Sequence, residues 1–366
     1  MMRQKGDEQM NQTNEPLHFA SDYMEGAHPA VLDALVQTNL LSTTGYGEDA
    51  FCRAAEREIL EACGCPDGEV RFLVGGTQTN AVVIDGLLRP WQGVVAADSG
   101  HIATHEAGAI ERGGHKVLAL PAAEGKISAG AIERLVRDYE ADENRDHLVM
   151  PGMVYLSQPT ELGTLYSLRE LREISAVCRS GGLALYVDGA RLAYALATPE
   201  NDVSLRDLAA LCDAFYIGGT KCGLLFGEAV VLPKKGAIPH FFSLIKQHGA
   251  LLAKGRVLGV QFDALFRDGL YGRIGVPAIE SAARIREKLA RCGFTLPVDS
   301  PTNQIFFLAD RALEAELSGR VEYGFMGQYD EDRVLLRFAT SWATTAAQTD
   351  ALLELLDDLS RAQRAR

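Results

Sequence analysis

In the stretch Leu183-Ala184-Leu185-Tyr186-Val187-Asp188-Gly189-Ala190-Arg191, an apolar run is followed directly by the charged residue Asp188. Its apolar half does not alternate with polar side chains, which is typical of a strand buried on both faces of a parallel sheet. Asp188 comes at the carboxyl end of this predicted strand, where open α/β sheets bind their ligands. Taken alone, the segment favours a helix cap or a buried structural carboxylate at Asp188, so a ligand site needs support from other segments.

Similar short apolar runs recur along the chain and alternate with helical patterns. The seven predicted strands are Val70–Val74, Val94–Ala97, Val117–Leu120, Met153–Ser157, Leu183–Val187, Ala214–Ile217 and Glu228–Leu232. The predicted helices between them are Phe51–Cys63, Ala81–Leu88, Ala131–Tyr139 and Ser167–Cys178. The last begins with Ser167-Leu168-Arg169-Glu170, the pattern of a capping box. This alternation predicts an α/β fold whose mostly parallel sheet is sandwiched by helices.

From about Asp268 the pattern changes to that of a smaller α+β domain. A predicted helix, Pro277–Cys292, is followed by two predicted strands and a terminal helix: Asn303–Leu308, Val334–Phe338 and Thr345–Leu359. The first 16 residues are polar and predict a disordered tail. We therefore expect a large domain over residues 17–267 and a small C-terminal domain over residues 268–366.

The 366 residues include 36 basic and 49 acidic side chains, a net charge of −13. A field of this sign repels polyanions, so nucleic acids and anionic membrane surfaces are poor partners, whereas local cations can still hold a small anion. The seven cysteines include one close pair, Cys63 and Cys65, whose spacing fits neither a redox motif nor a zinc site. Met1–Glu15 has no apolar core of a secretory signal, and no run approaches the ~20 apolar residues of a membrane span. We expect a cytoplasmic protein with reduced thiols and no bound metal.

The segment Gly75-Gly76-Thr77-Gln78-Thr79-Asn80 lies between a predicted strand and a predicted helix. A glycine turn at a helix N-terminus presents unpaired N–H groups and the positive end of the helix dipole, which suits a phosphate. Such turns also occur without any ligand. The segment matches neither the GxGxxG pattern nor a Walker loop, so a dinucleotide or ATP is not indicated.

Two further segments carry groups that could take part in a reaction. Lys221 lies between glycines in Ile217-Gly218-Gly219-Thr220-Lys221-Cys222-Gly223, just past a predicted strand. It is either a surface cation or a Schiff-base nucleophile whose pKa is lowered by desolvation. His101 and His105 follow the strand Val94–Ala97, in Gly100-His101 and His105-Glu106-Ala107-Gly108. A histidine here could also be a hydrogen-bonded core residue.

A phosphate loop, a histidine, an aspartate and a lysine thus follow successive predicted strands in that order. This combination resembles the fold-type-I enzymes that use pyridoxal 5'-phosphate (PLP), and more narrowly the threonine aldolase / aromatic amino acid β-eliminating lyase family. The resemblance covers about Leu17 to Leu359 and includes Phe19–Asp22, Gly45–Asp49 and Leu335–Phe338. It implies the PLP-transferase-like fold of the aspartate aminotransferase superfamily.

The resemblance also implies roles for single residues. Lys221 would bind PLP covalently, Asp188 would pair with the pyridine nitrogen and His101 would stack on the ring. The phosphate would be held by the backbone of Gly76, Thr77 and Gln78 and by the Thr220 hydroxyl. Beside the cofactor, the substrate carboxylate would be bound by Arg191, Arg337 and Ser21, since the planar fork of arginine pairs with a carboxylate through two hydrogen bonds.

The chain departs from the family pattern in two places. Glu161 stands where typical members carry a histidine. The base for the substrate hydroxyl would then be Glu161, His105 or a bound water, or the loop is reshaped around a different side chain. Family members place basic residues of one subunit near the phosphate of a neighbouring subunit. Lys246 stands at one of these positions, but Ala253 stands where an arginine is expected. A shared site implies a homodimer at least and favours a homotetramer, with Tyr46 either in the neighbour's site or packed in a loop.

The resulting expectation is a PLP-dependent lyase that cleaves the Cα–Cβ bond of threonine, allo-threonine or a related β-hydroxy-α-amino acid to glycine and an aldehyde. The nearest alternative is another PLP reaction on the same scaffold: β-elimination, transamination or racemisation. A non-catalytic PLP-binding protein and a protein that binds another phosphorylated ligand are the remaining alternatives.

Overall fold

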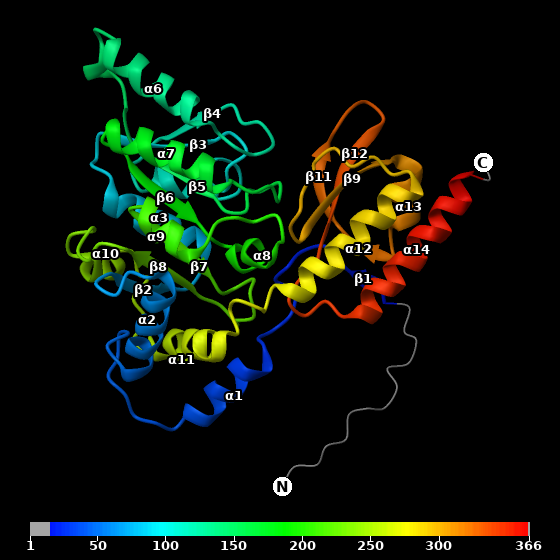
Figure 1. Cartoon of the computed structure of the whole chain (residues 1–366), viewed down its shortest axis with the longest axis horizontal. Coiled ribbons are helices and arrows are strands. Elements are labelled where there is room, and N and C mark those ends of the chain that lie inside the picture. The colour runs from blue at the N-terminus through cyan, green and yellow to red at the C-terminus, as the bar shows by residue number, and fades with distance from the viewer. Residues whose placement is uncertain (1–14, 365–366) are drawn as a thin grey trace.

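The computed structural model describes residues 15–364 of the chain, which form a large α/β lobe and a smaller lobe (Figure 1). Residues 1–14 of the predicted tail lie outside the described residues, and the first strand, β1, is Leu17–His18. Within the described part of the chain, no helix has both the length and the apolar character that crossing a bilayer requires.

A seven-stranded sheet in the order β2-β8-β7-β6-β5-β3-β4 forms the centre of the large lobe. Its strands are β2 (Glu69–Leu73), β3 (Gln92–Ala97), β4 (Val117–Leu120), β5 (Met150–Ser157), β6 (Ala184–Asp188), β7 (Ala214–Gly218) and β8 (Glu228–Leu232). Neighbouring strands from β4 across to β7 run parallel, whereas β8 runs antiparallel to both β2 and β7. The predicted α/β class with a mostly parallel sheet is confirmed.

Helices cover both faces of this sheet. The helices of the large lobe are α1 (Pro29–Thr38), α2 (Ala50–Cys63), α3 (Gly76–Leu87), α4 (His101–Thr104), α5 (Ala109–Arg112), α6 (Ala129–Ala141), α7 (Leu168–Ser180), α8 (Leu192–Ala197), α9 (Leu205–Leu211), α10 (Phe241–Gln247) and α11 (Arg256–Phe266), with the 3-10 turns η1 (Arg145–His147) and η2 (Arg267–Gly269). The core on one face contains residues of α3, α4, α5 and α10, and the core on the other contains residues of α2, α6, α7, α9 and α11.

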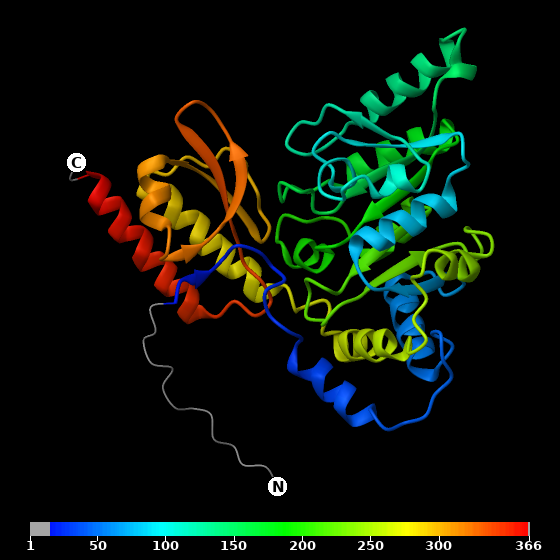
Figure 2. The ribbon, with the colours of Figure 1, turned by 180° about the vertical axis from the view of Figure 1, so that it is seen from behind.

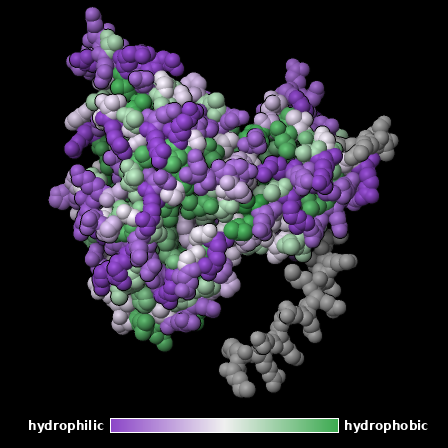
Figure 3. All heavy atoms as spheres, in the orientation of Figure 1, coloured by the Kyte–Doolittle hydropathy of each residue, from purple (hydrophilic) through white to green (hydrophobic). Residues whose placement is uncertain are grey.

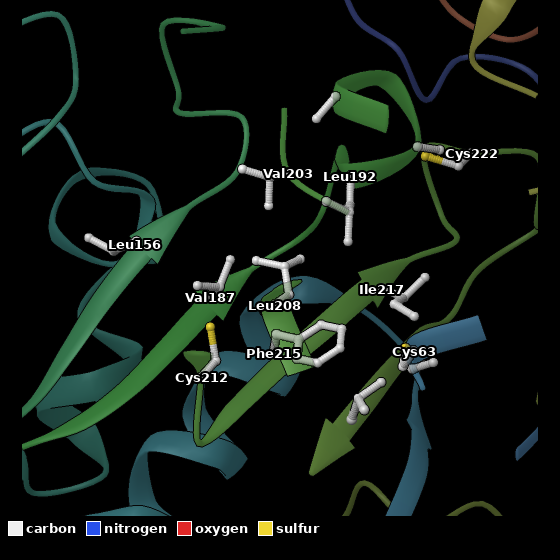
Figure 4. Packing of buried hydrophobic residues seen from close by; sticks show 14 of the residues in the cluster. Cys63, Leu156, Val187, Leu192, Val203, Leu208, Cys212, Phe215, Ile217 and Cys222 are labelled. Carbon is white, nitrogen blue, oxygen red and sulfur yellow. The ribbon is translucent and has the colours of Figure 1, made fainter. Parts of the chain in front are cut away.

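Alternate residues of each strand belong to different cores, which explains the continuous apolar runs in the sequence. On β6, Leu185 and Val187 belong to the core that includes α9, while Ala184 and Tyr186 pack with the core that includes α3. Figure 4 shows part of the core that includes α9, where Val187 is directed from its strand toward Leu208 of that helix. Complete burial of a leucine such as Leu208 stabilises the fold by roughly 1.5–3 kcal/mol.

Local signals place the helix ends. The predicted capping box of α7 is present: Ser167 Oγ accepts from Glu170 N–H, and the Glu170 carboxylate accepts from Ser167 N–H. Asp49 caps the N-terminus of α2, and Gly64 ends that helix in the left-handed conformation that glycine favours. In contrast, α3 begins at Gly76 rather than at the predicted Ala81, because the polar residues after the glycine turn already form its first turn.

The smaller lobe combines an antiparallel sheet with three helices. The sheet has the order β11-β12-β9, and its strands are β9 (Gln304–Asp310), β11 (Gly324–Gln328) and β12 (Arg333–Ala339). The helices are α12 (Val276–Cys292), α13 (Arg311–Leu317) and α14 (Ala346–Arg364). The sequence analysis did not predict β11, whose glycine-rich sequence resembles a loop. β1 pairs in parallel with β10 (Val321–Glu322) and lies beside α14 (Figure 2), so the N-terminal segment packs with the C-terminal elements. The proposed domain boundary near residue 268 stays a prediction.

Candidate active site

A cavity of about 230 Å³ lies at the carboxyl ends of β5, β6 and β7. It brings together eight of the residues predicted from the sequence: Gly76, Thr77, His101, Glu161, Asp188, Arg191, Thr220 and Lys221. Glu228, Tyr216 and Ser157 also line it and were not predicted to be site residues. The predicted Gln78, His105, Ser21, Tyr46 and Arg337 are not among its lining residues.

The N-terminus of α3 forms one wall of the cavity. Gly75 is the N-cap residue, and no side chain caps the helix, so the first N–H groups are left for a ligand. A side chain at Gly76 would place its Cβ 3.1 Å from the Tyr216 hydroxyl, which explains the glycine. The Gln78 side chain accepts from Val74 N–H at 3.2 Å and braces the turn. This wall can hold an anion such as a phosphate.

Lys221 follows Gly219 and Thr220 in the turn after β7 and is partly buried. Burial and the positive charge of Arg191 lower the pKa of Lys221, although the carboxylates of Asp22, Asp188 and Glu228 oppose the shift. A lower pKa increases the neutral fraction of the amine, which is the nucleophilic form.

Asp188 ends β6 within a set of hydrogen-bond donors that the sequence analysis did not identify. Its Oδ2 accepts from Tyr155 Oη at 2.7 Å and from Asn80 Nδ2 at 3.1 Å, and its Oδ1 accepts from Ala190 N–H at 3.0 Å. Asn80 and Tyr155 are both buried. These contacts hold the Asp188 carboxylate against the cavity, where it can pair with a cationic group of a ligand.

His101 is oriented by a second buried carboxylate. Its Nδ1 lies 2.8 Å from Glu106 Oε1, which also accepts from Asn80 Nδ2 at 2.7 Å. Asn80 therefore donates both to Glu106, which orients His101, and to Asp188. His105 is exposed, bonds to Thr104 Oγ1 and stacks on His101 with the ring centroids 5.8 Å apart. It lies behind His101 rather than in the cavity.

Glu161 lies in the loop after β5. Its Oε1 accepts from His101 N–H at 2.8 Å and from Ser157 Oγ at 2.7 Å. Burial raises the pKa of Glu161, and the nearby charge of Asp188 adds to this effect, while the two hydrogen bonds oppose it. The carboxyl group can therefore exchange a proton closer to neutral pH than an ordinary glutamate can.

Arg191 forms a buried ion pair that the sequence analysis did not predict. Its Nε and Nη2 donate to Asp22 at 2.6 and 3.0 Å, and Asp22 also accepts from Asn303 Nδ2 at 2.9 Å. Burial alone would raise the pKa of Asp22, but the charges of Arg191 and Lys221 hold it at about 2. The pair joins the N-terminal segment, the large lobe and the small lobe at the edge of the cavity.

Arg337 approaches this edge from β12 of the small lobe. It donates from Nη1 to Gln304 Oε1 at 2.8 Å and from Nη2 to the Ala20 carbonyl at 2.9 Å, while its buried Nε has no partner among the described residues. Burial and the positive charge of Arg191 lower the pKa of Arg337, so the two guanidinium groups lie near one another. Ser21 is half-buried next to Asp22.

Tyr46 lies elsewhere in this chain. It has a left-handed backbone with φ of 60°, its ring is 4.7 Å from Lys246 Nζ, and it lines a separate small pocket beside α2 and α11. Tyr46 and Lys246 thus lie together, but away from the cavity that contains Lys221.

Comparison with known proteins gives a consistent picture. Residues 18–353 match the family described as Beta-eliminating lyase. A low specificity L-threonine aldolase of Pseudomonas aeruginosa is 31% identical over 340 residues, which is 91% of this chain and 94% of the relative. The solved structure of a threonine aldolase of Leishmania major is 42% identical with a TM-score of 0.91, and the match covers 94% of this chain and all of that one. Aspartate aminotransferase of Thermus thermophilus, 15% identical with a TM-score of 0.70 over 94% of this chain and 92% of its own, shares the fold.

These matches confirm the family, the enzyme class and the cofactor predicted from the sequence. The protein is a lyase and its cofactor is PLP. A lysine, an aspartate and a helix N-terminus line the same cavity. The chain belongs to the beta-eliminating lyase family.

Proposed function

We propose that the protein cleaves the Cα–Cβ bond of a β-hydroxy-α-amino acid, such as threonine or allo-threonine, to give glycine and an aldehyde. The observation that carries this proposal is the convergence of Lys221, Asp188 and the α3 N-terminus on one cavity beside two arginines. The relatives from Pseudomonas aeruginosa and Leishmania major, which match nearly the whole chain, are named threonine aldolases and support the reaction class.

The cavity residues fit PLP group by group. When bound, PLP supplies an electron sink that stabilises negative charge at the substrate Cα. Lys221 would hold it covalently, Asp188 would pair with its ring nitrogen, and His101 would lie against its ring. The phosphate would be held by the groups at the end of the cavity: the N–H groups of Gly76, Thr77 and Gln78 and the Thr220 hydroxyl.

The substrate carboxylate would be bound where the two lobes meet. Arg191 uses Nε and Nη2 for Asp22, which leaves Nη1 for another acceptor. The unpaired Nε of Arg337 is a second donor, and the Ser21 hydroxyl is a third. A carboxylate fixed by these groups determines which bond at Cα is aligned for cleavage, because it holds the substrate in one orientation.

We assign the acceptance of the β-hydroxyl proton to Glu161 rather than to His105. Glu161 lines the cavity, and its Oε1 is held by two donors, whereas His105 is exposed behind His101. The raised pKa of Glu161 suits a group that takes up a proton during the reaction and releases it afterwards.

Product analysis with threonine and allo-threonine tests the proposal. We expect glycine and acetaldehyde from wild type and none from Lys221→Ala. Glu161→Gln should lower the rate by about 10²–10⁴-fold, which is typical for loss of a general base. His105→Asn is the comparison and should keep most of the activity. An unchanged rate in Glu161→Gln would exclude Glu161 as the base.

The same assay separates the alternatives on this scaffold. A keto acid with ammonia would indicate β-elimination, a keto acid without ammonia would indicate transamination, and an inverted amino acid would indicate racemisation. A cofactor spectrum that is unchanged in Lys221→Ala would refute the covalent attachment of PLP to Lys221.

We also propose that the active unit is a homodimer at least, and that a homotetramer is the favoured form. Apolar side chains of α1 and the following turn are exposed, with Val36, Leu40 and Leu41 at 76%, 93% and 55%, and apolar atoms gather at that end of the molecule in Figure 3. In such an oligomer Tyr46 and Lys246, which contact each other, would face a neighbouring subunit. Light scattering should give an oligomer for wild type and a smaller species for Leu40→Glu, while a monomeric wild type would refute the proposal.

We propose a cytoplasmic location. All seven cysteines are free thiols, and Cys63 and Cys65 stay unpaired although they are two residues apart. Reduced thiols are typical of compartments that keep disulfides from forming. Cell fractionation tests this assignment, and recovery of the protein in an oxidising compartment would overturn it.

A further inference from the structure

A buried carboxylate lies directly beside the turn that carries Lys221. Glu228, the first residue of β8, is 3% exposed and lines the cavity. Its Oε1 is 2.7 Å from Thr220 Oγ1, and its Oε2 accepts from Gly219 N–H at 3.3 Å. The sequence offered no signal for a site residue here, because Glu228 begins an apolar strand and belongs to no recognised motif.

The hydrogen bonds of Thr220 depend on whether Glu228 carries a proton. A threonine hydroxyl has one proton and two lone pairs, and Gly227 N–H donates to Thr220 Oγ1 at 3.0 Å. If Glu228 is ionised, the Thr220 proton points to Glu228 and a lone pair remains toward the cavity. If Glu228 is protonated, the Thr220 hydroxyl rotates so that a lone pair accepts from the Glu228 O–H, and the Thr220 proton then points to the cavity, where it can donate to an anion.

We propose that Glu228 is a protonated positioning residue, which donates to Thr220 and thereby turns the Thr220 hydroxyl into a donor to the phosphate of PLP. The inference rests on the proposed function, because it requires a phosphate at the N-terminus of α3. An ionised Glu228 would act in the opposite way: it would hold the Thr220 proton and add a negative charge next to the phosphate. The proton on Glu228 therefore controls how tightly the phosphate is held.

The surroundings of Glu228 favour the protonated form. Burial raises the pKa of Glu228 to about 8, and the charge of Asp188 adds to the rise, while the Thr220 hydrogen bond and Lys221 oppose it. The other titratable groups that face Glu228 are the phenols and the thiol of Tyr186, Tyr216, Tyr271 and Cys222. Burial raises the pKa of each of these four, so they stay neutral near pH 8. Lys221 also faces Glu228, and burial and the charge of Arg191 lower its pKa.

The test is the pH dependence of PLP binding rather than activity. The PLP dissociation constant of the full chain is measured from cofactor absorbance and tryptophan fluorescence between about pH 6.5 and pH 9.5 for wild type and Glu228→Gln. Glutamine keeps the size of the side chain, and its amide donates to Thr220 at every pH. The ratio of the two constants cancels the titration of PLP, which both proteins share. Glu69→Gln is the matched control, because Glu69 is a buried acid that faces the opposite end of β8 and does not line the cavity.

We expect the PLP dissociation constant of wild type, divided by that of Glu228→Gln, to be near one below pH 8. Above pH 8 this ratio should rise by up to about tenfold per pH unit, because the protonated fraction of Glu228 falls. The ratio of wild type to Glu69→Gln should stay constant. Infrared spectra should contain the carbonyl band of a protonated carboxylic acid in wild type and lack it in Glu228→Gln. A constant ratio for Glu228→Gln, with PLP bound through Lys221 in both proteins, would overturn the inference.

Thr220→Val gives an independent measurement if Glu228→Gln does not fold. Without the hydroxyl, PLP binding should be weaker, and its decline above pH 8 should be smaller than in wild type because only the charge of ionised Glu228 remains. An undiminished decline in Thr220→Val would overturn the inference. A wild-type protein that forms no Lys221-dependent absorbance with PLP would refute the proposed function itself, and this result is separate from the pH dependence.

Discussion

The buried ion pair between Asp22 and Arg191 allows a prediction with a definite sign and size. Both side chains lie at the edge of the cavity, Asp22 is 1% exposed, and two guanidinium nitrogens donate to its two oxygens. Replacement by asparagine keeps the size of the side chain and removes its charge. Arg191 is then left buried with a single neutral acceptor, and the substrate site loses the carboxylate that orients its arginine.

The pKa of Asp22 sets the magnitude. A fall from 3.8 to about 2 corresponds to roughly 2 kcal/mol, because one pKa unit is about 1.4 kcal/mol. The folded state has the lower pKa, so the stabilisation is complete above about pH 4 and is lost as the pH falls toward 2. Removing one partner of a buried pair commonly costs about 3–5 kcal/mol, so Asp22→Asn should lower the free energy of unfolding by between about 2 and 5 kcal/mol at pH 7.

Urea unfolding of wild type and Asp22→Asn, followed by circular dichroism at several pH values, measures this difference. The gap between the two proteins should be full at pH 7 and pH 5 and should shrink as the pH falls below 4. Asp330→Asn is the control, because Asp330 pairs with Arg333 at the surface and should have little effect on stability. A variant as stable as wild type at pH 7, or a gap that persists undiminished near pH 2, would refute the reasoning.

Three further predictions concern the cavity. Tyr155→Phe removes a donor to the Asp188 carboxylate, and since hydrogen bonds to charged groups contribute about 1.5 kcal/mol or more, PLP should bind at least about tenfold more weakly in an absorbance titration. Gly189→Ala would place a Cβ 2.0 Å from a backbone oxygen of β7, so we expect a loss of about 3 kcal/mol or more and a clear fall in melting temperature, whereas Gly26→Ala, with open space around it, should melt like wild type. The cleavage rate should rise with pH through a pKa above the usual 4.5 of glutamate, because Glu161 acts in its ionised form, and Glu161→Gln should lose this rise in a pH–rate profile.

Much of the fold could be predicted because its signals are local. The apolar run before Asp188 indicated a strand covered on both faces, and alternate residues of that strand do enter different cores. The capping box of α7 predicted its N-cap residue, Ser167. Other elements could not be predicted in this way, and β11 and β1 are two examples. β11 has a glycine-rich sequence and is a strand because β12 supplies its partners, and β1 is two residues long and exists only by pairing with β10.

The residues of the candidate site also fall into two groups: those that the sequence indicated and those that only the folded structure brings together. Lys221, Asp188 and the glycine turn could be recognised because they come at the ends of successive strands in an order that resembles a known family, although each of them alone has a structural explanation. Asn80, Glu106 and Tyr155 could not be assigned, although the first two lie in segments that the sequence analysis singled out. Their partners are 5 to 108 residues away along the chain, and only the folded sheet brings the side chains within hydrogen-bond distance.

The sequence by itself therefore determined the fold class and the cofactor and indicated candidate residues to contact it, because strand periodicity and the order of motifs are properties of the chain. The tertiary structure decided the supporting contacts: the Asp22–Arg191 pair, the Asn80 link and the Glu228–Thr220 bond. It also decided which candidate base faces the cavity, since Glu161 lines it and His105 does not. The physical reason is that burial and the distance between charges set protonation and orientation, and both exist only once distant segments have packed together.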